Sequence, residues 1–319
     1  MAGFELQPSD EDRHPVGPDD LWGESWYHDF AAVDGSYGGY LRLGLYPNQQ
    51  VAWYWVHLVR RGEPLVLIRA HDVPCPTAMN SPVELASPRV RGRWGPIEPL
   101  RSYRITTEGT AVALANPADA FHGEHGPDVA VRLDLEWDGV APGFAYAATT
   151  RFEQSAWVTG EVVIGDERIA VDCPGQRDHS WGVRDWWAFP WVWCSGRLDD
   201  GTWWHCARSA LAKAELFQTG YVVDPGASEW REATTIALDY QLDDELDGEM
   251  LPTSAQITVG DLELHLAPEL HAPVLLESSD GAKTSRFPRS MCAVTTPDGR
   301  TGHCWLEFNF PAGIEHLKS

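Results

Sequence analysis

Two arginine–aspartate pairs lie close together in the middle of the sequence. They are Arg177–Asp178 and Arg184–Asp185, and His179 directly follows the first pair. A carboxyl group buried among apolar side chains has a raised pKa and can act as a general acid that protonates an alkene. Asp178 and Asp185 are therefore the candidate acids, and His179 and Arg184 are the groups expected to orient them. Salt bridges that fasten a loop would produce the same pairs, and the sequence leaves that alternative open.

The same stretch is rich in tryptophan. Seven of the chain's 16 tryptophans lie between residues 181 and 204. A barrel core accommodates single indole rings, but so many large rings pack a small core poorly, and each buried indole N–H requires a partner. A concave aromatic pocket for an apolar ligand explains the cluster better, and aromatic faces can stabilise a cation. The expected lining residues are Trp181, Trp186, Trp187, Trp191 and Trp193.

Strand geometry predicts which of these side chains share a face. Because side chains alternate along a strand, residues 187, 189, 191 and 193 would line one face. The Asp-Gly turn at 200–201 predicts a hairpin, and a register in which paired residue numbers sum to 400 adds His205 and Ala207 to that face. This register would place Cys194 opposite Cys206, whereas a one-residue slip would separate them. Gly182 permits a bulge, so the alternation is not secure through it.

Two other segments carry candidate pocket residues. In 24-ESWYHDF-30, Glu24 and Trp26 share one face and Tyr27 lies on the other, although an edge strand of mixed polarity has the same pattern. In 304-CWLEFNFP-311, Glu307 lies on the face opposite the apolar one. It is either exposed to solvent or directed into the pocket, and the sequence does not decide between these.

The elements that must position these residues are mostly strands. Period-two runs separated by Gly, Pro and Asp-Gly turns recur along the chain, which predicts an all-β protein of two lipocalin-like antiparallel barrels or sandwiches with few short helices. The segment 209–217 is the best helix candidate and is also compatible with a strand. The expected division is a polar N-terminal arm at 1–19, a first domain at 20–158 and a second domain at 159–319.

Composition and missing motifs exclude several classes. The 319 residues carry a formal charge of −23, which disfavours nucleic acid and anionic membrane surfaces as partners. The N-terminus lacks an apolar signal region and no run is long enough to span a membrane, so we expect a cytoplasmic protein without stable membrane insertion. The six cysteines lack zinc spacing, and nucleotide-binding and hydrolase motifs are missing. We therefore expect no metal, no cofactor and reduced thiols.

The string D-H-x-W-G-x-R-x-W, from Asp178 to Trp186, resembles the two-domain lipocalin-like superfamily. This superfamily includes carotenoid hydratase (hydroxyneurosporene synthase), kievitone hydratase and the AttH-like proteins, and fungal pericyclases of similar double-barrel build lie near it. The resemblance covers the start of the second predicted domain and otherwise a pattern of strands. It implies two barrels with a pocket near their junction. It also implies cofactor-free hydration, dehydration, isomerisation or cyclisation of apolar substrates.

The resemblance also implies roles for particular residues. The histidine and tryptophan of H-x-W, which matter in the hydratases, correspond to His179 and Trp181. A Tyr-x-Asp on a following strand is thought to supply the acid there, but the comparable segment, 202-TWWHCARS-209, has neither residue. Either Asp178 or Asp185 takes that role, or the acid is one of the carboxylates at 24, 29 and 307, or the reaction is not hydration.

Together these features favour a cofactor-independent lyase (hydro-lyase), isomerase or cyclase that protonates an apolar, isoprenoid or polycyclic substrate in an aromatic pocket. The alternative is a non-catalytic lipocalin-like carrier of a hydrophobic small molecule, which needs the aromatic wall but no poised acid. A weaker alternative is that the tryptophans only pack two barrels together. The expected partner is the apolar small molecule, and a homodimer is left open.

Overall fold

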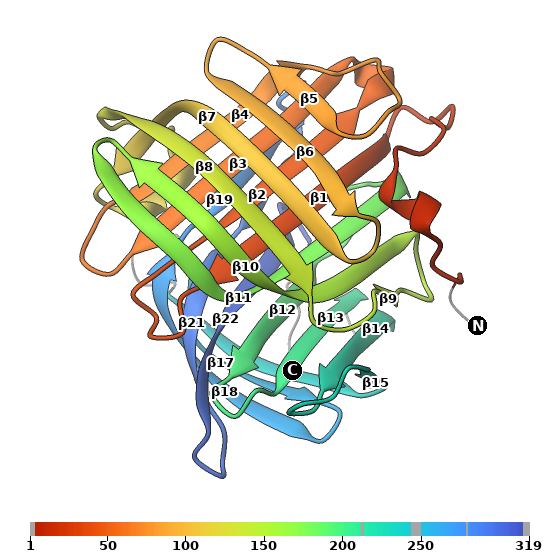
Figure 1. Cartoon of the computed structure of the whole chain (residues 1–319), viewed down its shortest axis with the longest axis vertical. Helices are drawn as coiled ribbons and strands as arrows, with labels where there is room; N and C mark the ends of the chain where they lie inside the picture. Colours follow the sequence, from red (N-terminus) through yellow and green to blue (C-terminus); the bar gives the residue numbers. More distant parts are fainter. Residues whose placement is uncertain (1–3, 212–213, 244–249, 279, 315–319) are drawn as a thin grey trace.

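The chain folds into strands whose side chains alternate between buried and exposed, as the period-two pattern predicts. The structure is a computed structural model and describes residues 4–211, 214–243, 250–278 and 280–314. Two large antiparallel sheets build the fold, which confirms the predicted all-β class (Figure 1). Within the described residues the helices are short 3₁₀ turns, namely η1 (Pro8–Glu11), η2 (Pro47–Gln49) and η3 (Pro117–Phe121).

Sheet 1 curls into a closed barrel. Its strand order is β4-β3-β2-β1-β11-β10-β8-β7-β6-β5, and β4 also pairs with β7, which removes the free edges of the ring. The short strand β9 pairs with β10. The strands are β1 (Trp22–Ala31), β2 (Tyr37–Tyr46), β3 (Val51–Arg60), β4 (Leu65–Pro74), β5 (Val83–Ala86), β6 (Val90–Glu98), β7 (Ser102–Leu114), β8 (Asp128–Gly139), β9 (Phe144–Ala145), β10 (Arg151–Ile164) and β11 (Glu167–Val183).

Sheet 2 follows in the order β15-β14-β13-β12-β22-β21-β18-β17-β16, with β20 bridging β22 and β19. Its strands are β12 (Trp191–Leu198), β13 (Trp203–Leu211), β14 (Ala214–Val223), β15 (Arg231–Glu232), β16 (Ile236–Asp243), β17 (Leu251–Val259), β18 (Leu262–His271), β19 (Val274–Glu277), β20 (Thr284–Phe287), β21 (Arg289–Thr295) and β22 (Thr301–Pro311). The helix candidate at 209–217 contains the end of β13 and the start of β14.

The chain passes from sheet 1 to sheet 2 through the linker 184–190. The sequence predicted a domain boundary at residue 158. β10 runs through residue 158, and the hairpin of β10 and β11 belongs to sheet 1. The difference arises because the end of β11 pairs with β1, with His28 opposite Arg177 and Trp22 opposite Val183. This pairing joins segments about 150 residues apart, and a local pattern does not reveal it.

The β12–β13 hairpin has the predicted register. Cys194 pairs with Cys206 and Trp193 with Ala207, so the paired residue numbers sum to 400. The six cysteines carry free thiols, and those of Cys194 and Cys206 contact each other in the core of sheet 2. The turn chemistry of Asp200-Gly201 therefore fixed this register, with Gly201 at a φ of 96°.

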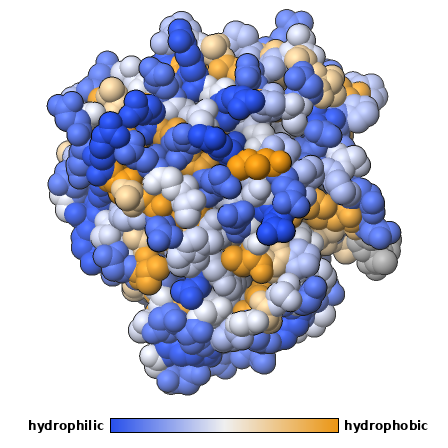
Figure 2. All heavy atoms as spheres, in the orientation of Figure 1, coloured by the Kyte–Doolittle hydropathy of each residue, from blue (hydrophilic) through white to orange (hydrophobic). Residues whose placement is uncertain are grey.

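Three apolar cores hold the fold together. One core is formed by residues of sheet 1 alone, and a second by residues of sheet 2 alone. The third lies between the sheets and contains residues of both. The face shown in Figure 2 is mostly hydrophilic, with scattered hydrophobic side chains. In the described part of the chain, no helix has the length and apolarity that a membrane crossing requires.

Close packing of β1 against β11 gives a first prediction. A Cβ atom at Gly175 would lie 2.1 Å from the carbonyl oxygen of Asp29. A main-chain atom of a paired strand cannot move aside as the end of a flexible side chain can. Gly175→Ala is therefore expected to lower the free energy of unfolding by about 1–3 kcal/mol. Urea unfolding measures this. At Gly23 the added Cβ would meet the Tyr46 ring at 3.1 Å, and Gly23→Ala is the milder control. Equal stability of Gly175→Ala and the unmodified protein would contradict the packing.

Candidate active site

A cavity of about 440 Å³ lies between the two sheets. Its volume falls in the range of roughly 300–1,000 Å³ that small-molecule sites occupy. Its lining side chains come from both sheets and from the linker 184–190. In sheet 1 they lie on β1, β2, β3, β10 and β11, and in sheet 2 they lie on β12, β13, β14, β20, β21 and β22. Aromatic side chains of both sheets line it, including Trp55 of sheet 1 and Trp191 and Trp193 of sheet 2.

One cross-strand row of sheet 1 forms the polar wall of the cavity. Register pairs Trp55 with Arg42, Arg42 with Tyr27, Tyr27 with Asp178 and Asp178 with Glu153, across β3, β2, β1, β11 and β10. Residues paired in this way point to the same face of a sheet. We call these five residues the carboxyl row.

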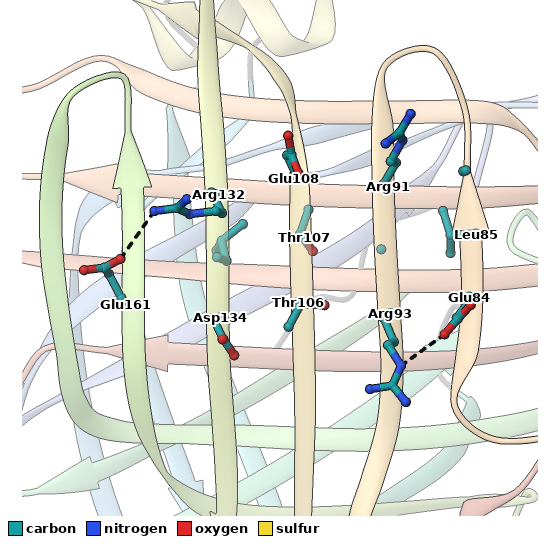
Figure 3. Close-up of a pocket in the computed structure, with 13 residues that line it drawn as sticks. Glu84, Leu85, Arg91, Arg93, Thr106, Thr107, Glu108, Arg132, Asp134 and Glu161 are labelled. Carbon is teal, nitrogen blue, oxygen red and sulfur yellow. Dashed lines mark hydrogen bonds and ion pairs between the residues drawn. The ribbon is translucent and has the colours of Figure 1, made fainter.

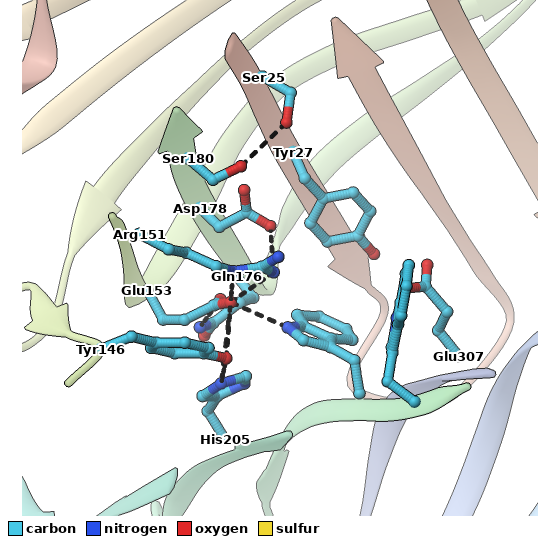
Figure 4. Close-up of polar contacts among 12 residues, drawn as sticks. Ser25, Tyr27, Tyr146, Arg151, Glu153, Gln176, Asp178, Ser180, His205 and Glu307 are labelled. Carbon is cyan, nitrogen blue, oxygen red and sulfur yellow. Dashed lines mark hydrogen bonds and ion pairs between the residues drawn. The ribbon is translucent and has the colours of Figure 1, made fainter. Parts of the chain in front are cut away.

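The next row on the same face lies two residues along each strand. It contains Trp53, Gly44, Ser25, Ser180 and Arg151, and we call it the serine row. The hydroxyl oxygens of Ser25 and Ser180 lie 3.1 Å apart (Figure 4). Arg151 is close enough to reach from this row to the carboxylates of the carboxyl row.

Asp178 is the carboxyl group of the carboxyl row that lines the cavity. Its Oδ2 accepts a 2.7 Å hydrogen bond from Nη2 of Arg151, while Oδ1 has no hydrogen-bond partner among the described residues (Figure 4). Burial raises the pKa of Asp178 to about 7, although the charge of Arg151 lowers it in part and that of Glu153 raises it. Near neutral pH this group is thus poised between its acid and its base form, as a general acid requires.

Glu153 is the ionised partner beneath Asp178. It is fully buried and accepts hydrogen bonds from Nε of Arg151 at 2.8 Å, from Gln176 at 2.9 Å and from Trp193 at 3.0 Å. Burial raises the pKa of Glu153, but Arg151 and these further contacts lower it by more, so the net pKa is lowered. Two neighbouring carboxyl groups therefore have pKa values displaced in opposite directions, an arrangement that separates an acid from a permanent anion.

A tyrosine and a histidine complete the network. The hydroxyl of Tyr146 lies 2.7 Å from Nε2 of His205 and donates to Glu153 at 3.3 Å (Figure 4). Burial lowers the pKa of His205 to about 4, so its imidazole is neutral at pH 7. His205 therefore supports the network through Tyr146.

A row of sheet 2 forms the opposite wall. Register pairs Ala207 with Trp193, Trp193 with Glu307 and Glu307 with Arg289. Glu307 forms an ion pair with Arg289 and accepts from the indole N–H of Trp191 at 3.2 Å. The Arg289 guanidinium lies 4.6 Å from the centre of the Tyr27 ring, which joins this row to the carboxyl row.

The structure brings together some of the predicted site residues and separates others. Those that line the cavity are Asp178, Arg184, Asp185, Trp186, Trp191, Trp193, Tyr27 and Glu307. Those that do not line it are His179, Trp181, Trp187, His205, Glu24 and Trp26. Of the second group, four residues lie on the opposite face of β1 or β11, namely Glu24, Trp26, His179 and Trp181, and residue 187 lies in the linker, where strand alternation does not apply. His205 lies on the same face of β13 as Ala207, as predicted, but its ring contacts Tyr146 instead of lining the cavity.

Asp185 and Arg184 line the cavity in structural roles. The Asp185 carboxylate accepts the main-chain N–H of Trp187 at 3.0 Å and so closes a turn of the linker. Arg184 donates to the carbonyl oxygens of Thr150 and Trp181 at 2.9 and 2.8 Å. Burial lowers the pKa of Arg184 to about 10. Of the two candidate acids, Asp178 has the geometry of an acid.

His179 lies on the opposite face of β11, beneath the N-terminal arm. Its Nε2 is 3.1 Å from Oε1 of Glu24, its Nδ1 is 2.8 Å from the carbonyl oxygen of Asp10, and its ring stacks on Trp26. His14 of the arm lies 2.8 Å from the same Glu24 oxygen and stacks on Trp181. The predicted role of His179 in orienting the acid is replaced by a role in fastening the arm.

Among the described residues, one group could hold a metal ion, and it consists of His14, Glu24 and His179. One donor atom each from His14, Glu24 and His179 lies within 4.8 Å of the others. The Glu24 oxygen already accepts the main-chain N–H of His14 at 3.0 Å, and Arg13 lies 3.7 Å from the other oxygen. Oε2 of Glu24 has no hydrogen-bond partner, but the positive guanidinium of Arg13 beside it and the contacts already made by Oε1 favour a polar contact over a cation site.

Several residues of the site escaped the sequence analysis. They are Arg42, Trp55, Tyr146, Arg151, Glu153 and Arg289. Some signal was present, because Arg42 interrupts the apolar run 40-YLRLGLY-46 and a charge inside such a strand is rarely buried without a purpose. The pairing that unites these residues is long-range, and no local pattern contains it.

A wider hollow of about 800 Å³ lies on the outer face of sheet 1, over β5, β6, β7, β8 and β10 (Figure 3). Its rim carries ion pairs such as Arg93–Glu84 at 3.1 Å and Arg132–Glu161 at 3.8 Å. The residues that the structure places around it include no aromatic side chain. It is a solvated, charged surface, and the chemistry favours the cavity between the sheets.

Comparison with known proteins agrees with this fold. The sequence matches over residues 7–312 the family described as "Domain of unknown function (DUF7064)". No curated protein sequence matches the chain. An AttH-like protein from Nitrosomonas europaea is similar in structure, with a TM-score of 0.66, 14% identity, and coverage of 97% of this chain and 98% of that chain.

Two further structures have the same architecture. Kievitone hydratase from Nectria haematococca gives a TM-score of 0.62 at 10% identity, covering 96% of this chain and 93% of that chain. CghA gives 0.58 at 10% identity, covering 97% and 94%. At such identities the likeness shows the fold, which is the two-domain lipocalin-like one that the D-H-x-W-G-x-R-x-W string predicted.

Proposed function

The chain belongs to the family described as domain of unknown function DUF7064, and on that premise we propose that it is an acid catalyst of apolar substrates. The reaction would be a hydration or dehydration, an isomerisation or a cyclisation of an isoprenoid or polycyclic molecule held between the sheets. The observation that carries the proposal is Asp178, a buried carboxyl group with a pKa of about 7 that faces an aromatic cavity. Similar folds in a hydratase and in CghA, a cyclase, support it.

The proposed step begins with the protonated form of Asp178. Its O–H bond breaks as the π electrons of the substrate take the proton and form a C–H bond, which leaves a cation on the neighbouring carbon. The faces of Trp191, Trp193 and Tyr27 line the cavity and would stabilise that cation. Attack by water gives hydration, loss of another proton gives isomerisation, and attack by a second double bond gives cyclisation. The Asp178 carboxylate then recovers a proton from water or from the substrate.

Arg151 and Glu153 would restore the acid between turnovers. Arg151 Nη2 lies 2.7 Å from Asp178 and 2.6 Å from Glu153, so its positive charge is shared by both carboxyl groups. Because the negative charge of Glu153 offsets the positive charge of Arg151, Arg151 lowers the pKa of Asp178 only in part. Asp178 can therefore be protonated again near neutral pH. Proton transfer of this kind supplies about 10²–10⁴-fold acceleration, and stabilisation of the cation by the aromatic faces would supply the rest.

Deuterium transfer tests the proposed function. Native mass spectrometry of the protein from its source would first identify the apolar molecule that co-purifies with it. Incubation of that molecule or its precursor in deuterium oxide is expected to place one deuterium on carbon in the product of hydration, isomerisation or cyclisation, and for a dehydration the same label is expected when the alkene is supplied and the reaction runs in reverse. Asp178→Asn is expected to abolish the transfer, and Asp185→Asn is expected to retain it. A bound apolar molecule with no deuterium transfer would contradict the proposal and favour the carrier.

A further inference from the structure

Arg42 is a buried arginine of the cavity that forms no ion pair among the described residues, and its charge acts on Asp178 only at longer range, where it lowers the pKa of that carboxyl group. It is 5% exposed, and its guanidinium lies between the rings of Trp55 and Trp186, 4.7 Å from the centre of each. Nη2 donates to the hydroxyl of Tyr46 at 3.2 Å, whereas Nη1 is buried without a hydrogen-bond partner. A buried cation without an anion is costly, so its retention points to a partner supplied from outside the chain.

The other arginines that line the cavity have their charge or their donors engaged. Arg151 pairs with Asp178 and Glu153, and Arg289 pairs with Glu307. Arg184 donates to main-chain carbonyl groups. Arg42 therefore differs from the other three arginines in having neither an ion pair nor a main-chain acceptor for its guanidinium.

The cavity also has an excess of hydrogen-bond donors. Buried donor atoms without a partner belong to Arg42, Arg289 and Trp186, all of which line it. Among the described lining residues, no buried acceptor atom is left without a partner. A ligand that satisfied this wall would present acceptors, and a carboxylate presents two oxygens with about four lone-pair positions.

Gly44 makes room for the guanidinium. It lies in the serine row, one step from Arg42 on the same face of β2. A Cβ atom there would lie 2.6 Å from Nη1 of Arg42. A larger residue at this position would displace the guanidinium from the space between the two indole rings.

The charge balance of the cavity agrees with an anionic ligand. Four arginines and three carboxyl groups line it, in a chain of formal charge −23. With Asp178 in its protonated form, the wall is net positive. Such a wall opposes a developing carbocation, and an anionic group on the substrate would offset part of this opposition.

We propose that Arg42 binds a carboxylate of the ligand, so that the substrate of this site is an apolar carboxylic acid. The carboxylate would lie at Arg42, with its oxygens within reach of the indole N–H of Trp186. Arg42 and Asp178 lie on either side of Tyr27 in the carboxyl row, and their strands are roughly 10 Å apart. The reacting double bond would therefore lie several carbon atoms from the carboxyl group. This choice of substrate class rests on the proposed function, but the binding of the carboxylate does not.

Matched retinoids test the proposal, because they quench tryptophan fluorescence and differ only at the end group. All-trans-retinoic acid is expected to bind at least tenfold more tightly than all-trans-retinol and than methyl retinoate. Arg42→Gln is expected to lower the affinity for the acid to that for the alcohol, with the alcohol unchanged within about threefold. Gly44→Ala is expected to reduce the preference in the same direction while Arg42 is retained.

Arg197→Gln is the matched control, since Arg197 also lies near two tryptophan rings, Trp157 and Trp203, but outside the cavity. It is expected to leave the preference for the acid intact. Equal binding of acid and alcohol by the unmodified protein, or failure of the acid to bind, would overturn the proposal. Asp178→Asn separates it from the proposed function, because this variant is expected to keep the preference for the acid while it loses deuterium transfer. Full turnover by Asp178→Asn would refute the acid and leave the carboxylate site standing.

Discussion

Asp178→Asn is expected to raise the free energy of unfolding above pH 7 and to lower turnover by about 10²–10⁴-fold. The pKa of Asp178 is raised from its ordinary value of 3.8 to about 7, chiefly by burial. The folded protein therefore binds this proton more tightly than the unfolded chain. The stabilisation from that proton is fully present below about pH 4 and is lost as the pH rises through 7. Above pH 7 the native state carries a buried carboxylate that costs on the order of 2–4 kcal/mol.

The variant removes that cost, because Asn has nearly the same shape and carries no charge. Arg151 keeps an anionic partner in Glu153, so the substitution does not leave an unpaired cation. Urea unfolding at pH 5 and at pH 8 measures the difference, which is expected to be small at the lower pH and clearly stabilising at the higher. Asp185→Asn is the control, since it removes a second carboxylate of the cavity, one that accepts a main-chain N–H at a turn of the linker. A variant less stable than the unmodified protein at pH 8 would show that Asp178 stabilises the fold as a carboxylate.

The Asp178 carboxyl group is therefore expected to lower the stability of the fold above pH 7 and to be required for the proposed proton transfer. A protein that needed only to pack its two sheets would gain by replacing Asp178 with a neutral side chain. A carrier of apolar molecules would gain in the same way. The proposal that Asp178 transfers a proton gives a physical reason for keeping a destabilising carboxyl group in the wall of an aromatic cavity.

The parts of the site that sequence could predict are those set by local geometry. Alternation along β11 separates Asp178 from His179, and the Asp-Gly turn sets the register that places Trp193 beside Ala207. Alternation also places Tyr27 opposite Trp26. These predictions need only neighbouring residues, because the period of a strand and the length of a hairpin turn are local properties.

The parts that sequence could not predict depend on which strands pair. Glu153, Asp178 and Arg42 become neighbours in one row only when β1 lies between β2 and β11. Such pairing joins segments far apart in the chain and has no local signature. The linker 184–190 is a different case, because its residues are not in a strand and strand parity does not apply to them. Both Trp186 and Trp187 were expected to line the pocket, and of the two only Trp186 lines the cavity.

The contacts of the N-terminal arm also lie beyond the sequence analysis, which predicted only a polar arm at residues 1–19. Glu11 and Arg177 are each 2% exposed, and Nη1 of Arg177 donates to both oxygens of Glu11, at 2.8 and 3.0 Å. Together with the contacts of His179 and Glu24, this pair seals the face of β1 and β11 that lies opposite the cavity. The arm thus backs the strands that carry Tyr27 and Asp178.

Glu11→Ala is expected to lower the free energy of unfolding by about 3–5 kcal/mol, because it leaves the Arg177 guanidinium buried and without an anion. Nη2 of Arg177 already has no hydrogen-bond partner, and among the described residues Glu11 is the carboxylate that forms an ion pair with Arg177. Urea unfolding measures the loss. Asp12→Ala is the control on the same arm, since Asp12 is exposed and such changes usually stay within about 0.5 kcal/mol.

The double variant Glu11→Leu with Arg177→Met separates the cost of an unpaired charge from the loss of the arm's packing. Apolar side chains of similar size replace a buried ion pair at little or no cost in many proteins, so the double variant is expected to recover most of the stability that Glu11→Ala loses. Arg177 also donates to Gln154 at 2.8 Å, and the loss of that hydrogen bond limits the recovery by about 1 kcal/mol. If the double variant is as unstable as Glu11→Ala, the ion pair itself contributes net stability, and the arm is fastened by charge. If it recovers, the arm is fastened by packing, and the loss in Glu11→Ala is the cost of a buried charge without a partner.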